Sequence, residues 1–340
     1  MVLRVSKVCC GLHHVVLLVS EEESSSSSSS ASSSPSSASS LKPTSSSVAC
    51  LGWNEHGQCD VPRELRVRCG SGGSAANTSI AAGDRHSLAI ITDGERSTIH
   101  VWGQDNFQQC SSVPAPLDTE SDDRRRKYVM IDAGQFHSVV LDSEGEVTCW
   151  GGNNFGQCDV PETIGPCVAV AAGGDFTVAL RRDDGALFAW GANRQGQAPG
   201  KVQPPSRVVA VAAGAFFGAA LCADCADNRI FTWGDNALHD SLDVEDDDAD
   251  TGGVVSAIAC GTNHAVVALK RGGVVESGRV PETARLPDDV KLKCVSGTYN
   301  SSFGVDENGT LHVWRGEDPH ISRSSLGAIG INAAVHHHPL

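Results

Sequence analysis

The sequence has few bulky side chains and no long apolar run. Two tyrosines, two methionines and nine phenylalanines occur among 340 residues, whereas glycine occurs 36 times. An apolar run at 15–19 has five residues, and no stretch approaches the roughly 18 apolar residues of a membrane-spanning helix. This profile argues against a helical bundle and favours a turn-rich β protein with small residues on its strands.

Positive charge is also scarce. The chain has 26 Lys and Arg against 41 Asp and Glu, a formal net charge of −15. Such a balance argues against direct binding to nucleic acid or to an anionic membrane. The 13 cysteines are odd in number and match no disulfide framework, which favours a reducing compartment. The run at 15–19 is too short for a signal peptide, so we expect a soluble protein of the cytoplasm or nucleus.

One phrase occurs twice in the chain. CLGWNEHGQCDVP at 50–62 returns as CWGGNNFGQCDVP at 149–161, with nine of thirteen positions identical. Self-similarity at a distance is typical of a repeat protein.

Two anchors define the repeat. The first ends a segment of small residues and falls at Gly11, Gly83, Gly134, Gly173, Gly214, Gly261 and Gly297. The second is Trp102, Trp150, Trp190, Trp233 or Trp314, with Leu51 and Ser277 at the same place in two units. Six of the spacings are 16 to 19 positions, and the first is 40 because a Ser-rich tract interrupts it. The sequence therefore contains seven units.

Each unit predicts short strands. Gly-x-x-His opens an apolar run in four units, at His14, His86, His137 and His264, and an Asp- and Gly-rich turn leads to a second apolar run. Such turns join β-hairpins, and the small-residue segment adds a further strand. Seven units of three or four strands predict an all-β, seven-bladed β-propeller, in which neighbouring blades bury each other's faces.

These residues resemble the regulator of chromosome condensation repeat. WGGNNFGQ at 150–157 and WGANRQGQ at 190–197 match it well, GWNEHGQ at 52–58 matches from its Gly onward, and the resemblance covers about 4–316. It implies a seven-bladed propeller. Phe176, Phe217 and Asn300 depart from the pattern at the His position, the sixth unit lacks its Trp, and the seventh reads WRGE.

The domain boundaries follow from the repeats. Residues 1–20 and 48–316 are assigned to the propeller, and 21–47 to a Ser-rich insertion that cannot fold. This insertion is either a phosphorylation-controlled arm or a tolerated insertion. Residues 317–340 form a C-terminal tail, in which INAAV near 331 is either a worn eighth first strand or a strand that closes the ring.

The repeated Gly, Trp and His residues are interpreted as structural. A functional surface is expected instead in a loop, and the acidic insertion is the candidate. Its residues are Asp243, Glu245, Asp246, Asp247, Asp248 and Asp250. Residues 122–127 form a basic insertion, and Cys222-x-x-Cys225 lacks the second pair that zinc requires. We therefore expect no metal and no cofactor.

The sequence offers no catalytic motif, so we expect a monomeric, non-catalytic scaffold that binds a protein partner through propeller loops. The family resemblance implies two alternatives. One is guanine-nucleotide exchange on a Ran-like small GTPase, and the other is a substrate-recruiting propeller like those that precede the catalytic domain of HECT-type ubiquitin ligases.

Overall fold

The computed structural model describes most of the repeats. The described residues are 3–21, 46–66, 77–93, 96–116, 126–223, 230–235, 255–278, 286–299, 301–314, 321, 326–327, 331 and 333–336. Nearly all of the Ser-rich insertion and the whole acidic segment 243–250 lie outside this part of the chain.

Seven sheets follow one another along the chain, and all their strand pairs are antiparallel except the last pair of sheet seven. Sheet one has β1 (Leu3–Cys10), β2 (His14–Glu21) and β3 (Ser46–Gly52); sheet two has β4 (Asn77–Ala82), β5 (His86–Asp93) and β6 (Arg96–Gly103); sheet three has β7 (Tyr128–Ala133), β8 (His137–Asp142) and β9 (Val147–Gly151). Sheet four has β10 (Cys167–Ala172), β11 (Phe176–Arg181), β12 (Leu187–Gly191) and β13 (Gly200–Val202); sheet five has β14 (Val208–Ala213), β15 (Phe217–Cys222) and β16 (Ile230–Gly234). Sheet six has β17 (Val255–Cys260), β18 (His264–Leu269) and β19 (Val274–Gly278); sheet seven has β20 (Leu292–Gly297), β21 (Ser302–Asp306), β22 (Leu311–Trp314) and β23 (Ala333–His336). One short helix, α1 (Arg63–Arg66), lies between sheets one and two.

The recurring sequence signals of each unit account for these strands. The small-residue segment forms the first strand, the run after Gly-x-x-His the second, and the run before Trp-Gly the third. Gly145 and Gly185 take φ angles of 91° and 67° in their hairpin turns, a backbone region that glycine enters without steric cost. The Gly of Trp-Gly also has a positive φ, as at Gly151 with 101°.

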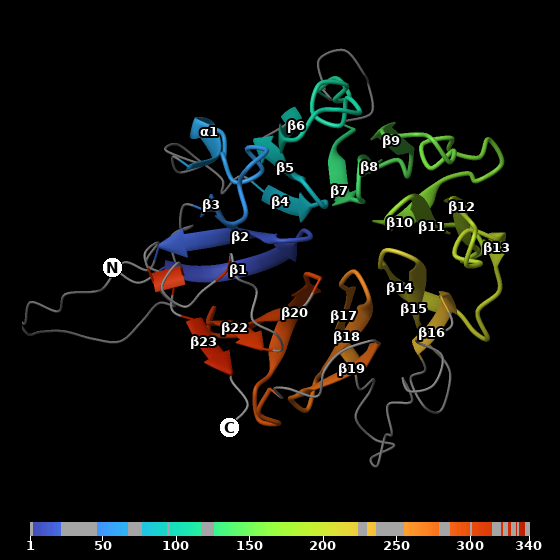
Figure 1. Cartoon of the computed structure of the whole chain (residues 1–340). Helices are drawn as coiled ribbons and strands as arrows, with labels where there is room; N and C mark the ends of the chain where they lie inside the picture. Colours follow the sequence, from blue (N-terminus) through green and yellow to red (C-terminus); the bar gives the residue numbers. More distant parts are fainter. Residues whose placement is uncertain are drawn as a thin grey trace, which may run out of the picture.

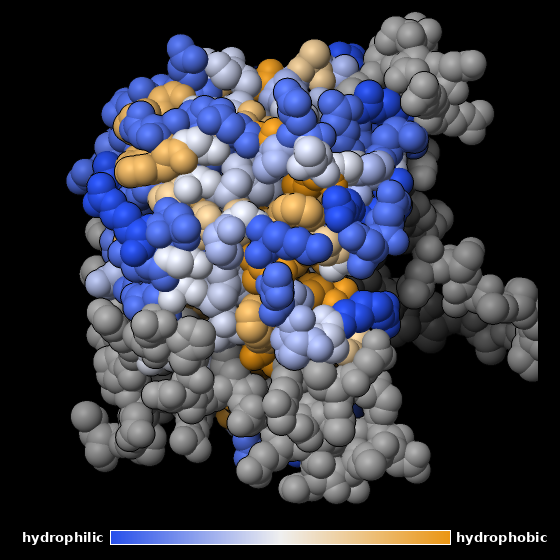
Figure 2. Space-filling view, turned by 90° about the vertical axis from the view of Figure 1, so that its right-hand side faces the viewer, coloured by the Kyte–Doolittle hydropathy of each residue, from blue (hydrophilic) through white to orange (hydrophobic). Residues whose placement is uncertain are grey.

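The sheets lie around a common centre (Figure 1). Apolar clusters fill the space between neighbouring sheets. One of them joins Val16 and Val48 of sheet one to Ile80, Ala89 and Trp102 of sheet two. Figure 2 views the outer edge of the ring where β13 and β16 lie; polar residues cover much of its coloured surface, and apolar residues gather near its middle. The predicted all-β propeller, with seven sheets for seven repeats, is confirmed.

The last sheet packs against the first. Ser296 Oγ accepts a hydrogen bond from the Cys10 backbone N–H at 3.0 Å, and Lys293 Nζ donates to the Val5 carbonyl at 3.4 Å. Strand β23 pairs in parallel with β22, and Ile331 bridges to Leu3. Residues 333–336 thus form the fourth strand of sheet seven. No helix in the described part of the chain is long and apolar enough to cross a membrane.

Candidate functional site

The recurring histidines join each blade to the next. His14 Nε2 lies 2.9 Å from Ser87 Oγ, His86 Nε2 3.0 Å from Ser138 Oγ, His137 Nε2 3.0 Å from Thr177 Oγ1, and His264 Nε2 3.1 Å from Ser302 Oγ. All four side chains are completely buried. We call these four the seam histidines, and each contact a polar seam.

The seam hydroxyl group fixes the histidine tautomer at His137 and His14. Thr177 Oγ1 donates its single proton to the Gln157 carbonyl at 2.8 Å, so it must accept from the Nε2–H of His137. Ser87 repeats this arrangement with the Gln58 carbonyl, also at 2.8 Å. Burial lowers the pKa of His14, His86 and His137 to about 4, 3 and 4. These imidazoles are therefore neutral, and those of His14 and His137 serve as structural donors.

Two seams are apolar at the same place. Phe176 and Phe217 replace the histidine, and both rings are buried. The residue that corresponds to the seam hydroxyl in the following sheet is Gly218 in one case and Ala265 in the other. Histidine thus occurs with a hydroxyl, and phenylalanine with a residue that has no polar side chain.

The anchor glycines make room for these rings. A Cβ on Gly83 would lie 2.4 Å from both the Gly134 carbonyl oxygen and His86 Cε1. A Cβ on Gly173 would lie 2.0 Å from the Phe176 ring. Gly134, Gly214 and Gly261 are crowded in the same way, so the anchor must be glycine where a histidine or phenylalanine ring follows it. In sheet seven the small Ser301 follows instead, and Thr298 takes the anchor place.

In three places a tryptophan indole N–H donates to the backbone carbonyl of a glutamine in the preceding unit. Trp102, Trp150 and Trp233 donate their indole N–H to the carbonyls of Gln58, Gln109 and Gln197 at 2.9, 3.0 and 3.0 Å. Trp190 Nε1 has no hydrogen-bond partner among the described residues. Between sheets six and seven, Glu276 Oε1 accepts from both Trp314 Nε1 at 3.1 Å and Ser302 Oγ at 2.6 Å.

These repeat residues are buried within the framework, so a binding surface must be sought elsewhere. The loops after the first strands and those after the third strands lie at one end of the sheets. The backbone N–H of Gly152 donates to the Phe136 carbonyl at 2.7 Å, and that of Asp235 to the Phe216 carbonyl at 2.9 Å.

Large aromatic side chains gather at this end. Phe107, Phe155, Phe216 and Tyr299 are 38%, 47%, 46% and 44% exposed. We call these four residues, together with Trp53 and Phe136, the aromatic face. The Phe107 and Phe136 ring centroids lie 4.8 Å apart, and the Arg85 guanidinium stands 5.5 Å from the centre of the Trp53 ring.

A central cavity of about 420 Å³ opens among the first strands. Its lining includes Asp84, Asp175, Phe216 and Tyr299 from the loops of the aromatic face. Burial raises the pKa of Asp84 to about 6 and raises that of Asp175. A partner's cation close to these two carboxylates would relieve that penalty.

Cysteines also line the cavity but remain thiols. Burial raises the pKa of Cys9 to about 11, and raises those of Cys260 and Cys294. No group of three or more metal-ligating side chains occurs among the described residues. Cys222 is buried, and Cys225 lies outside the described part.

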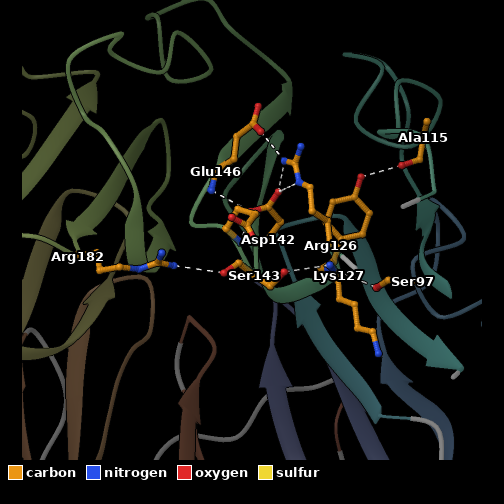
Figure 3. A network of polar contacts seen from close by, with 10 residues as sticks. Ser97, Ala115, Arg126, Lys127, Asp142, Ser143, Glu146 and Arg182 are labelled. Atoms are coloured by element: carbon orange, nitrogen blue, oxygen red, sulfur yellow. Dashed lines mark hydrogen bonds and ion pairs between the residues drawn. The ribbon is translucent and has the colours of Figure 1, made fainter. Parts of the chain in front are cut away.

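At the opposite, hairpin end, Arg126 from the basic insertion lies within a polar network (Figure 3). Its Nε donates to Asp142 Oδ2 at 2.9 Å, and its guanidinium also pairs with Glu146. Asp142 is only 4% exposed and also accepts two backbone N–H groups of its own turn. Arg126 therefore supports a hairpin turn and is not available to a partner.

The structure does not test the predicted partner loop, because Asp243, Glu245, Asp246, Asp247, Asp248 and Asp250 lie outside the described residues. The sequence prediction missed the aromatic face. A signal was present for two residues: Phe136 and Phe216 stand at the second position after an anchor glycine, directly before the histidine position. In sheet seven the structure places Thr298, not Gly297, at the anchor, because its N–H donates to the Ser301 carbonyl as Gly134 N–H donates to His137. Tyr299 therefore directly follows the anchor.

The comparisons with known proteins agree with this architecture. A family model for the regulator of chromosome condensation (RCC1) repeat matches residues 129–157 and 167–197. The human probable E3 ubiquitin-protein ligase HERC6 is 27% identical over 251 residues, 61% of this chain and 24% of that protein. Rat HERC4 is 27% identical over 60% of this chain and 20% of that protein. The chain therefore spans about a quarter or less of these relatives.

Solved structures share the fold. Prp20p of Saccharomyces cerevisiae, studied with its binding to Gsp1p and histones, superimposes with a TM-score of 0.52 at 25% identity, over 70% of this chain and 71% of Prp20p. The CRINKLY ectodomain of the Arabidopsis thaliana receptor kinase ACR4 gives 0.60 at 18% identity, over 95% and 99%. The chain therefore contains repeats similar to the regulator of chromosome condensation repeat, arranged as seven sheets around a common centre.

Proposed function

We propose that this propeller is a non-catalytic scaffold that binds a protein partner through the aromatic face. The observation that carries the proposal is the set of Phe107, Phe155, Phe216 and Tyr299, each more than a third exposed at one end of the ring. Exposed aromatic side chains on a rigid support are typical of protein interfaces. The seams hold their loops in place, so little order has to be gained on binding.

Charge narrows the kind of partner. Asp84 and Asp175 line the cavity beside this face, and the chain carries a net charge of −15. A partner surface that combines apolar groups with lysine or arginine side chains complements both features. We expect a monomer in the cytoplasm or nucleus that binds neither nucleic acid nor membrane directly and uses no cofactor.

The test compares two double variants in affinity capture from cell extract, with the retained proteins identified by mass spectrometry. Phe155→Ser with Phe216→Ser alters the aromatic face. Val168→Ser with Val209→Ser is the matched control, because both valines are 46% exposed near the start of first strands, away from this face. Partners should be lost from the first variant and kept by the second. Equal retention by both variants would contradict the proposal.

Guanine-nucleotide exchange on a Ran-like small GTPase is the second candidate, favoured by the similarity to Prp20p, which was studied with its binding to Gsp1p. An exchange factor stabilises the nucleotide-free GTPase, so nucleotide leaves faster. The direct test is release of a fluorescent GDP analogue from a purified Ran-type GTPase, with and without the chain. An unchanged release rate, and no GTPase captured after EDTA stripping, would exclude exchange.

A substrate-recruiting role is a third candidate because the curated relatives are ubiquitin ligases that extend far beyond the matched region. In that case the captured proteins should accumulate when the chain is depleted from cells. Stable levels of those proteins would leave the scaffold without a role in degradation.

A further inference from the structure

Two thiols of the first repeated phrase are in contact. Cys50 near the end of β3 and Cys59 after the following loop place their sulfur atoms 2.8 Å apart. Both side chains are partly exposed. Only a small approach of the two sulfur atoms is needed to reach the roughly 2.05 Å of a disulfide bond.

Equivalent cysteines in two other sheets provide an internal comparison. Cys110 and Cys158 stand where Cys59 stands, and their thiols donate to the backbone carbonyls of Gln104 and Gly152 at 3.2 and 3.3 Å. The corresponding contact of Cys59, to the Trp53 carbonyl, lengthens to 3.6 Å. Cys59 is therefore turned toward a second sulfur.

We propose that Cys50 and Cys59 form a reversible disulfide when the chain meets a small-molecule disulfide such as oxidised glutathione. The thiolate of Cys59 attacks one glutathione sulfur, forms a mixed disulfide and releases one glutathione thiolate. The Cys50 sulfur, after losing its proton, attacks Cys59 Sγ and releases the second. The two protein thiols are oxidised, the oxidised glutathione is reduced to two thiols, and the two thiol protons pass to the released thiolates.

The order of the two thiols follows from their surroundings. Burial, reinforced by the neighbouring Cys59, raises the pKa of the Cys50 thiol well above its usual range. Cys50 is therefore the resolving thiol and not the first nucleophile. Since its deprotonation limits the second step, we expect oxidation to be slow and to accelerate as the pH rises.

The disulfide would restrict the loop between sheets one and two. The loop between the two cysteines carries Trp53 of the aromatic face, and its Gln58 carbonyl accepts from both Ser87 and Trp102 of sheet two. A disulfide would hold this carbonyl against the neighbouring blade. The inference does not depend on the proposed function, because it concerns the state of the loop whatever the partner.

Glutamate residues in the sequence make the bond directly observable. The purified chain is equilibrated in glutathione buffers of rising oxidised fraction, its free thiols are blocked with N-ethylmaleimide during unfolding, and it is cut with a glutamate-specific protease. Glu55 lies between the two cysteines, so the reduced chain yields 24–55 and 56–64 as separate peptides. The oxidised chain should yield them joined, at the sum of the masses of the two unblocked peptides less about 2 Da for the two hydrogens lost.

The same digest contains its own references. Cys149 and Cys158, the equivalent pair of sheet three, fall together in 147–162, and Cys110 falls alone in 96–120. The 24–55/56–64 pair should join at a lower oxidised fraction than the one that closes 147–162. Oxidation should also raise the thermal midpoint by a few degrees, and dithiothreitol should reverse that rise.

Two variants complete the test. Cys59→Ser should remove both the joined peptide and the thermal shift, whereas Cys110→Ser should keep both. The proposal is overturned if the two peptides stay separate throughout the glutathione series. It is also overturned if Cys50 pairs with Cys9 or Cys10 instead. Both results are read from the wild-type chain and need no variant to fold.

Discussion

The pairing of histidine with a hydroxyl across each polar seam predicts a measurable coupling. His137 Nε2 and Thr177 Oγ1 lie 3.0 Å apart, and both side chains are fully buried. Thr177→Ala leaves the His137 N–H without an acceptor, which costs about 1–3 kcal/mol in a buried site. His137→Phe removes the donor and introduces a larger ring that faces a hydroxyl. We expect each single variant to lower the free energy of unfolding.

The double variant should lose less than the sum of the two. A phenylalanine ring facing an alanine methyl group would reproduce the apolar seam in which Phe217 of sheet five precedes Ala265 of sheet six. Because the unsatisfied donor is then gone, we expect a favourable coupling of about 1–2 kcal/mol, within the range for contacting residues. Urea unfolding followed by tryptophan fluorescence measures all four proteins of the cycle.

A second cycle is the control. His86→Phe with Thr177→Ala uses the same substitutions, but His86 pairs with Ser138 and not with Thr177. These two changes should add to within a few tenths of a kcal/mol. If the coupling for His137 and Thr177 is no larger than in this control, the seam hydrogen bond does not determine which residues can face each other.

Three further predictions rest on the same framework. Burial lowers the folded-state pKa of three seam histidines to about 4, 3 and 4, so their contribution to stability is present above pH 6.5 and is lost as the pH falls toward 4. The urea midpoint should drop over that pH window. A flat profile would show that the histidines do not titrate on unfolding. Glu276→Ala removes the acceptor shared by Trp314 and Ser302 and should lower the free energy of unfolding by about 1–3 kcal/mol. Glu276→Gln keeps an acceptor oxygen and should lower it clearly less in the same assay. Equal losses of stability would contradict the shared-acceptor role. Gly83→Ala should lower the thermal midpoint by several degrees, since its Cβ would lie 2.4 Å from the Gly134 carbonyl oxygen. The control is Gly327→Ala, where nothing lies within 4 Å of an added Cβ, and it should leave the midpoint unchanged. Equal midpoints would refute the steric role of the anchor.

The fold could be predicted from the sequence because it depends on periodic signals. Small residues, the Gly-x-x-His segment, a glycine turn and Trp-Gly recur at nearly fixed spacing, and each corresponds to one strand or turn. The seam hydroxyls also have a fixed place in the sequence, because Ser87 and Thr177 directly follow His86 and Phe176. Its meaning needs the structure, because only the ring brings the histidine of one blade to the hydroxyl of the next.

The candidate site was harder to predict for a physical reason. Attention to charge favours long acidic or basic insertions, yet Arg126 of the basic insertion is engaged with Asp142 in a hairpin turn. The aromatic face comes from single residues, Phe107, Phe155, Phe216 and Tyr299, in four different units. Phe107 and Phe155 share one repeat position, five residues after the anchor tryptophan, but Phe216 stands at another, so no single repeat position marks the four as one surface. They come together because loops from successive blades end on the same side of the ring.

The sixth repeat shows how the framework and the surface can vary separately. This unit has lost its tryptophan, and residues 279–291 that follow it contain no glutamine. In the second sheet a glutamine carbonyl accepts from both a seam hydroxyl and a tryptophan indole. Here the Glu276 carboxylate accepts from the equivalent donors, Ser302 and Trp314. A buried hydroxyl and a buried indole without acceptors would destabilise the seam, so the departure from the repeat pattern is compensated at the level of hydrogen bonds. No such constraint acts on Phe155 or Phe216, whose side chains are nearly half exposed. These two positions can therefore change without loss of the ring, so the proposed partner surface can vary independently of the seams.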